Sequence, residues 1–258
     1  MNKQTTFEKY LSGNDSLYSS IVNKNFNKIK LFRLIYIRLK IYLRRFYFFR
    51  FLQMINFSTG KYANKNTDLT IDGFQRSANT FAYVGFSILN KHTRVAHHAH
   101  TSSQIIYSVN NDIPVLLLIR NPIDSIVSFY IFLNGEVPFK VIINSWKHFY
   151  LPLIKFKDKI FVSDFNDTIN DFEDTIKKIN SFYNLNFKTN YYEKDLEKKI
   201  FKKIEQSHKN HFDNSSKNKI AIPYNDRLRS KSVLKQVVKK DFKKEIEECK
   251  LIYDKFTR

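Results

Sequence analysis

Short apolar segments alternate with segments of helical periodicity from residue 68 onward, and this alternation constrains the fold more than any other feature. The run I-P-V-L-L-L-I over 113–119 is its most continuous apolar segment, as expected of a central parallel strand covered on both faces. Strands are also predicted over 69–74, 94–98 and 159–163, and helices over 79–90, 102–111, 122–133, 139–156, 169–183 and 231–256. Such alternation forms right-handed β-α-β units, so we predict an α/β fold with an open parallel sheet flanked by helices.

The length and composition suit one globular domain with an N-terminal appendage. Of the 258 residues 43% are hydrophobic and 16% aromatic, too many for a disordered chain. Gly is scarce, Cys249 is the single cysteine and no repeat is visible, which excludes collagen-like, disulfide-stapled and repeat architectures. We therefore divide the chain into an N-terminal lead-in with a helix over 1–60 and a globular domain over 61–258.

The appendage contains a predicted basic amphipathic helix over 29–57. Lys and Arg interrupt this segment too often for a membrane span. In a helix, six of its cations fall within one sector: Lys30, Arg33, Arg38, Lys40, Arg44 and Arg45. Such a helix can lie on an anionic membrane surface as a peripheral contact, or it can pack on the domain's own core with its cations in water. Both interpretations stay open.

The net charge predicts an anionic partner. Lys and Arg number 44 against 24 Asp and Glu, a formal net charge of +20. Charge of this sign attracts nucleotides, anionic lipids and nucleic acids alike, so it does not choose between them.

Two loops that follow predicted strands carry residues suited to binding an anion at the carboxyl edge of the sheet. The first, D-G-F-Q-R-S-A-N-T-F over 72–81, brings Arg76 to a helix N-terminus, where unpaired N–H groups favour an anion. The second, I-R-N-P-I-D-S-I-V-S-F-Y over 119–130, ends a strand at Arg120. Helix capping explains Asp124 in this loop, but a charge that ends so apolar a strand indicates an anionic partner.

Together the two loops resemble the nucleotide-binding signature of sulfotransferases that use 3′-phosphoadenosine 5′-phosphosulfate (PAPS). That family has an apolar-P-[KR]-S-G-T-T-[FWY] loop and, after a later strand, R-[ND]-P-x-D-x-x-x-S. This chain has F-Q-R-S-A-N-T-F and R-N-P-I-D-S-I-V-S in the same order. It departs from the family pattern at Gln75, Ala78 and Asn79. The resemblance covers about 69–256 and implies a P-loop-like three-layer fold.

The resemblance also implies roles for the loop residues. Arg76 corresponds to the loop cation that contacts the sulfonate and the bridging oxygen. The 5′-phosphate is expected to lie against Ser77, Ala78, Asn79 and Thr80. Arg120 and Ser128 are expected to hold the 3′-phosphate. The segment I-P-Y-N-D-R-L-R-S-K over 222–231 resembles a C-terminal segment of bacterial family members, which adds Arg227 as a further nucleotide contact.

A cluster of three histidines supplies candidates for a general base. The second predicted strand ends R-V-A-H-H-A-H, and imidazole suits this work because its pKa is about 6.5. In an extended segment His98 and His100 share one side and His97 lies opposite. The family's catalytic His aligns best with His98, and His100 is the second candidate. A zinc site is the alternative, disfavoured because no Cys or carboxylate is near in sequence.

The sequence therefore predicts a PAPS-dependent sulfotransferase that acts on a hydroxyl or amine of a carbohydrate or lipid acceptor by in-line displacement. The expected location is the cytoplasm or the inner membrane surface, and no metal is expected. The alternative is a non-enzymatic basic protein that binds anionic lipid or nucleic acid, with nucleic acid the less favoured of the two.

Overall fold

The computed structural model describes residues 35, 39, 62–189, 196–211 and 226–258. Of the predicted N-terminal helix, only Ile35 and Leu39 are included, and both are helical and about half exposed, at 50% and 52%. The rest of the predicted 29–57 helix, and with it the boundary near residue 60, lies outside the described residues. Within the described part, no helix is long and apolar enough to cross a membrane.

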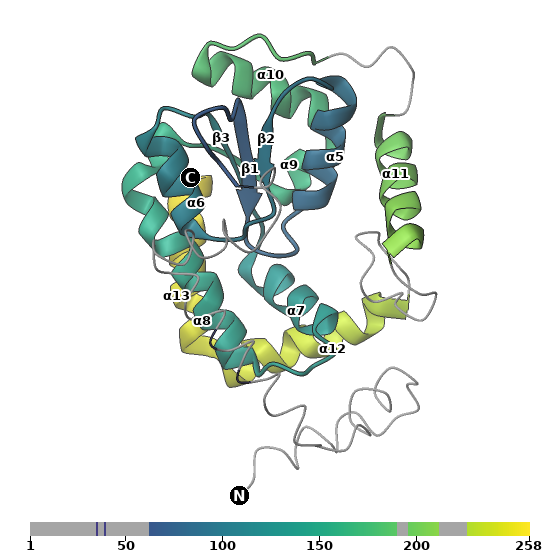
Figure 1. Ribbon diagram of the computed structural model, residues 1–258. Coiled ribbons are helices and arrows are strands. Elements are labelled where there is room, and N and C mark those ends of the chain that lie inside the picture. The colour runs from purple at the N-terminus through teal and green to yellow at the C-terminus, as the bar shows by residue number, and fades with distance from the viewer. Residues whose placement is uncertain (1–34, 36–38, 40–61, 190–195, 212–225) are drawn as a thin grey trace, which may run out of the picture.

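A parallel sheet of four strands forms the centre of the described fold (Figure 1). The strands are β1 (Leu69–Gly73), β2 (Val95–His97), β3 (Val115–Ile119) and β4 (Phe161–Asp164), in the order β2-β1-β3-β4. The register pairs Ile71 with His97 and Gly73 with Leu118, so the carboxyl ends of the strands meet at one edge. This confirms the predicted parallel α/β sheet and the positions of its strands.

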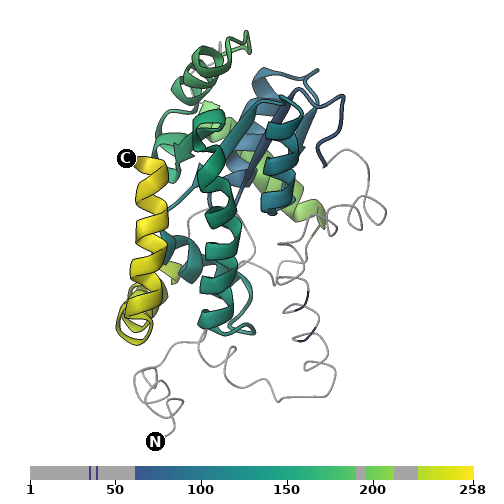
Figure 2. The same cartoon turned by 90° about the vertical axis from the view of Figure 1, so that its left-hand side faces the viewer.

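Ten helical segments occur in the described residues from 62 onward, in chain order α5 (Asn79–Leu89), α6 (Ser102–Asn110), α7 (Pro122–Phe132), α8 (Phe139–Tyr150), the 3₁₀ helix η1 (Leu151–Lys159), α9 (Phe165–Asn170), α10 (Phe172–Tyr183), α11 (Leu196–His211), α12 (Asp226–Asp241) and α13 (Lys243–Thr257). Side chains from α5, α10 and α11 cover one face of the sheet. Those from α6, α7, α8, α12 and α13 form the cluster on the other face (Figures 1 and 2). The chain is therefore a three-layer fold.

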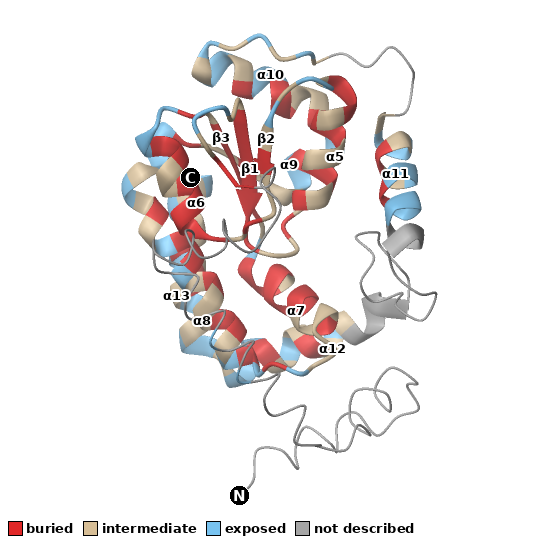
Figure 3. Cartoon of the chain, viewed as in Figure 1, coloured by how far each residue is buried: buried red, intermediate tan, exposed pale blue. Residues whose placement is uncertain are grey.

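Alternation along β3 explains why it lies at the centre. Leu116 and Leu118 pack with the α5 and α10 side, whereas Leu117 and Ile119 pack with the α7 and α8 side. All four side chains are fully buried, as the red strands of Figure 3 show. Burying each one stabilises the fold by roughly 1.5–3 kcal/mol relative to exposure.

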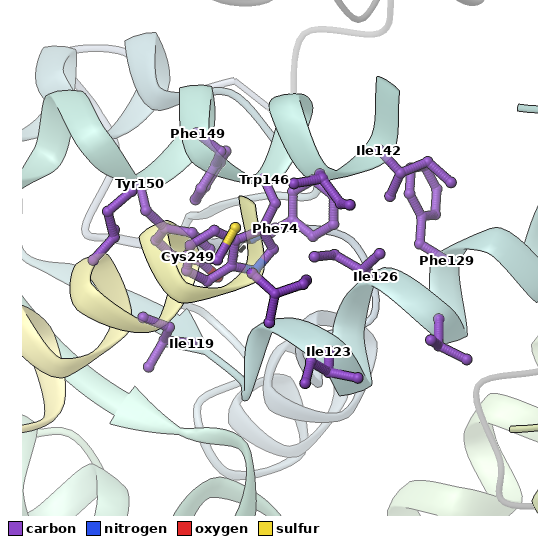
Figure 4. Packing of buried hydrophobic residues seen from close by; sticks show 14 of the residues in the cluster. Phe74, Ile119, Ile123, Ile126, Phe129, Ile142, Trp146, Phe149, Tyr150 and Cys249 are labelled. Atoms are coloured by element: carbon purple, nitrogen blue, oxygen red, sulfur yellow. Dashed lines mark hydrogen bonds between the residues drawn. The ribbon is translucent and has the colours of Figure 1, made fainter. Parts of the chain in front are cut away.

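Aromatic packing supports the loop that follows β1. Phe74 contacts Phe129 and Phe149 edge to face and lies in the cluster of Trp146 and Tyr150 (Figure 4). The Tyr150 hydroxyl donates to the Leu118 carbonyl at 2.8 Å and accepts from the Phe74 N–H at 3.2 Å. Burial raises the pKa of Tyr150, so its hydroxyl keeps the proton that it donates. The first residue of the loop is thus fixed by the core.

Three predicted helices are interrupted in the structure. The one predicted over 139–156 ends at Tyr150 and continues as η1, whose early Pro152 lacks the N–H that an α-helical bond needs. The one predicted over 169–183 is two helices, because the Asp171 side chain accepts from the Asp174 N–H and caps a new start. The one predicted over 231–256 breaks at Phe242, which lets α12 pack on α7 and α13 on α8.

Candidate functional site

Three chain segments meet at the carboxyl edge of the sheet. The loop 74–78 follows β1, the turn 98–101 follows β2, and Arg120 follows β3 directly. Phe165 begins α9 after β4 and packs its ring 3.7 Å from the Arg120 guanidinium carbon. The structure therefore brings the loops singled out in the sequence to one place.

The loop 74–78 reaches α5 through two residues in the left-handed region, Arg76 at φ 70° and Ala78 at φ 68°. Ala78 is the N-cap of α5 and has no side chain that could accept from the first N–H groups. Asn79 donates its side-chain amide to the Phe74 carbonyl at 2.9 Å and closes the loop. This bond uses one of the two N–H donors of the Asn79 amide, so the predicted phosphate contact of Asn79 can come from the second one or from its backbone N–H.

Replacing Ala78 by Gly is expected to raise the free energy of unfolding by about 1 kcal/mol, because a side chain at positive φ is strained and Gly is not. Ala82 lies one turn into α5 with its N–H bonded to the Ala78 carbonyl at 3.0 Å. Ala82→Gly should instead destabilise by about 1 kcal/mol. Urea unfolding of both variants tests this, and equal destabilisation by the two would contradict it.

Two hydrogen bonds join the first loop to the second. Arg76 donates from Nε to the Ser128 hydroxyl at 3.2 Å, and Arg120 donates from Nη1 to the Arg76 carbonyl at 3.0 Å. Ser128 is buried in α7, nearly two turns beyond the helix start. Two guanidinium groups and a hydroxyl that the sequence predicts as nucleotide ligands thus form one connected network.

The Arg120 guanidinium is half-buried, and no carboxylate among the described residues forms an ion pair with it. Burial lowers its pKa, and Asp124 and Asp164 only partly offset this. Both carboxylates have other partners: Lys235 pairs with Asp124, and the Tyr253 hydroxyl donates to Asp164 at 2.6 Å. A cation taken from water in this way is costly unless an anion joins it.

Of the six buried polar side-chain atoms without a hydrogen-bond partner among the described residues, three lie at residues 75–79. They are Gln75 Oε1, Ser77 Oγ and Asn79 Oδ1. Such atoms are rare in folded proteins and each costs about 1–3 kcal/mol. The Ser77 hydroxyl, which lies near the Tyr150 hydroxyl, can donate to a phosphate, whereas the two amide oxygens only accept and cannot.

The histidine segment differs from the predicted extended form. β2 ends at His97, and His98 and His100 have φ values of 58° and 51°, so the chain turns instead of alternating faces. His97 therefore does not lie opposite: its Nδ1 is 2.6 Å from His98 Nδ1, and its ring stacks on Tyr83 at 3.5 Å between centroids. His98 Nε2 lies 3.1 Å from the Thr80 hydroxyl in the first turn of α5.

His100 is fixed by Asp72, which sequence reasoning missed as a site residue. Asp72 is fully buried in β1 and accepts from the His100 N–H at 2.9 Å. The His100 Nδ1 lies 2.8 Å from the Gly73 carbonyl. The signal in the sequence was a carboxylate inside an apolar strand, since buried charges require partners. Phe165 and Tyr253 were missed too, and nothing in their sequence surroundings marked them.

Two predictions remain: Arg227 as a nucleotide contact, and a zinc site as the alternative role of the histidines. Arg227 lies in the first turn of α12, but its side chain is outside the described residues. In the described part of the chain, no three His, Cys, Asp or Glu side chains converge as a metal site would require.

Comparison with known proteins leaves the family open. No protein-family model matches the chain, and no curated protein matches its sequence. Among solved structures it is similar to the mouse sulfotransferase SULT7A1 complexed with PAP, at 12% sequence identity, over 76% of this chain and 92% of that chain, with a TM-score of 0.49.

Proposed function

We propose that the chain transfers a sulfonate group from PAPS to a hydroxyl or amine of a carbohydrate or lipid acceptor. One observation carries this proposal: the Arg120 guanidinium is half-buried, has no ion-paired carboxylate among the described residues, and is bonded to the loop that holds Arg76. A doubly anionic nucleotide would supply charge to both cations at once.

The two loops divide the nucleotide between them. Arg120 and Ser128 hold the 3′-phosphate, while Ser77, Thr80 and the uncapped N–H groups of α5 hold the 5′-phosphate. Arg76 already donates toward Ser128 at 3.2 Å. In the proposed complex its guanidinium contacts the bridging oxygen between phosphorus and sulfur, where negative charge develops as the S–O bond breaks. Phe165 stacks on Arg120 and keeps its planar group oriented.

Catalysis of this kind depends on alignment and charge more than on covalent chemistry. The acceptor oxygen attacks sulfur in line with the leaving oxygen, and the electron pair of the broken bond stays on the 5′-phosphate of adenosine 3′,5′-bisphosphate (PAP). The proton of the acceptor passes to the imidazole of His98 or His100, directly after β2.

Calorimetry with PAP tests the proposal. Arg120→Ala is expected to raise the dissociation constant for PAP by about 10- to 100-fold, because a charge-assisted hydrogen bond is worth roughly 1.5–3 kcal/mol. Adenosine 5′-monophosphate lacks the 3′-phosphate, so its affinity should change much less. Arg94→Ala is the matched control: it removes an exposed Arg that pairs with Asp68, and should leave PAP binding unchanged.

Absence of PAP binding at micromolar concentration would refute the proposal, and so would equal effects of Arg120→Ala on PAP and on adenosine 5′-monophosphate. If PAP fails to bind while anionic vesicles bind with a steep salt dependence, the non-enzymatic interpretation is correct instead.

A further inference from the structure

His100 is held in one tautomer by a backbone carbonyl. Its Nδ1 lies 2.8 Å from the Gly73 oxygen, and because a carbonyl can only accept, Nδ1 carries the hydrogen. The lone pair of the neutral ring is therefore on Nε2, and within the described residues nothing hydrogen-bonds to this atom. The side chain is 17% exposed, so Nε2 can be reached. These are the requirements for a general base.

His98 lacks such a lone pair because both of its ring nitrogens are engaged. Nδ1 lies 2.6 Å from His97 Nδ1, and Nε2 lies 3.1 Å from the Thr80 hydroxyl. With the hydrogen on Nδ1, Nε2 accepts from Thr80. With the hydrogen on Nε2, Nδ1 accepts from His97. In neither arrangement does His98 keep a lone pair for an incoming proton.

A nucleotide strengthens this difference. If the Thr80 hydroxyl donates to the 5′-phosphate, its oxygen can only accept from His98, and His98 must carry hydrogen on Nε2. Bound nucleotide thus fixes His98 as a donor to Thr80. The ring of His100 lies 5.6 Å from that of His98 between centroids, so it is close to the same reaction centre while its Nε2 stays available.

Asp72 gives His100 its position. It accepts from the N–H groups of His100 at 2.9 Å and Gly73 at 3.0 Å, and from the Gln104 amide at 3.4 Å. These bonds hold the turn in which His98 and His100 have positive φ, a conformation that costs energy in residues with side chains. The carboxylate also lies 3.4 Å from His100 Nδ1, so it contacts the ring as well as the backbone of this residue.

We infer that His100 is the general base of the proposed sulfonate transfer, with Asp72 as its positioning residue and His98 as a support for Thr80. The inference rests on the proposed function. As the acceptor oxygen bonds to sulfur and the bridging S–O bond breaks, the acceptor proton moves to Nε2 of His100. PAP leaves with the electron pair of the broken bond, and the imidazolium later loses its proton to water.

Imidazole tautomers measured by long-range ¹H–¹⁵N NMR on the full chain test this directly. We expect His100 as the Nδ1–H tautomer with and without PAP, and His98 with hydrogen on Nε2 once PAP is bound. His100→Gln and His98→Gln assign the signals. Asp72→Asn is expected to give His100 mixed tautomers while PAP affinity changes by less than about threefold.

Release of PAP from PAPS, with water as acceptor, gives the second measurement. At saturating PAPS, His100→Gln should lower the rate by about 100-fold or more, whereas His98→Gln should act mainly on nucleotide affinity through Thr80. His92→Gln changes an exposed histidine and is the control for both readouts. If Asp72→Asn does not fold, the His100 and His98 variants still decide between the two rings.

The inference and the proposed function fail in different ways. His100 found as the Nε2–H tautomer, or a larger rate loss for His98→Gln at saturating PAPS, overturns the inference while PAP binding still supports a sulfotransferase. No PAP binding removes the proposed function, and the His100 tautomer then reports only on the local geometry.

Discussion

Replacing Arg76 by Ala is expected to lower the rate of PAP release from saturating PAPS by about 100- to 1000-fold, the usual effect of removing one donor from the position where charge develops. PAP itself lacks the sulfonate, so its dissociation constant should rise by no more than about tenfold. The difference follows from the proposed roles: the Arg76 side chain reaches from the first loop to Ser128, and in the proposed function it contacts the bridging oxygen of the donor. Single-turnover rates and calorimetry measure the two quantities separately.

The controls for this prediction separate charge from geometry. Arg76→Lys keeps the cation but loses the Nε–H that donates to Ser128, so an intermediate rate is expected. Ser128→Ala removes the acceptor and should weaken PAP binding through the lost 3′-phosphate contact. If Arg76→Ala reduces PAP affinity and the rate by the same factor, Arg76 binds a ground-state phosphate and its assignment to the sulfonate is wrong.

The strands could be predicted from the sequence because each is a short apolar run bounded by polar residues. Val115 to Ile119 is buried without exception, and such a run has few alternatives to a central strand. The ends of the helices were harder to predict from the sequence. The split at Asp171 depends on a side-chain cap, and the one at Phe242 on which neighbours α12 and α13 pack against. Both are decided by competition between local and tertiary contacts.

Candidate site residues could be predicted only where the residue type is unusual for its position in a strand or helix. Arg120 ends an apolar strand and Arg76 precedes a helix, so each indicates an anion from its place in the sequence alone. The contact between Arg76 and Ser128 joins loops distant in sequence, and no spacing rule reveals it. The ring positions of His98 and His100 depend on positive φ values that a sequence of non-glycine residues does not predict.

Gly73→Ala is expected to destabilise the fold by about 3 kcal/mol and to lower nucleotide binding with it. An added Cβ would overlap the Leu118 carbonyl oxygen on β3 and lie 3.0 Å from the Leu118 Cβ, and backbone in a central strand cannot move aside. That same carbonyl accepts from the Tyr150 hydroxyl, which in turn holds Phe74 at the start of the loop. Displacing one strand atom therefore disturbs both core and site.

Gly85→Ala is the matched comparison, because its Cβ also meets atoms at close range but of a different kind. Those atoms are the side-chain ends of Ile200 and Phe172, at 2.8 Å each, and side chains can rotate away. Ala also favours a helix over Gly by about 1 kcal/mol, which offsets part of the crowding. Urea unfolding should therefore separate the two variants by about 2 kcal/mol or more. Equal stability of the two would mean that β1 and β3 are not as close at Gly73 as the structure has them.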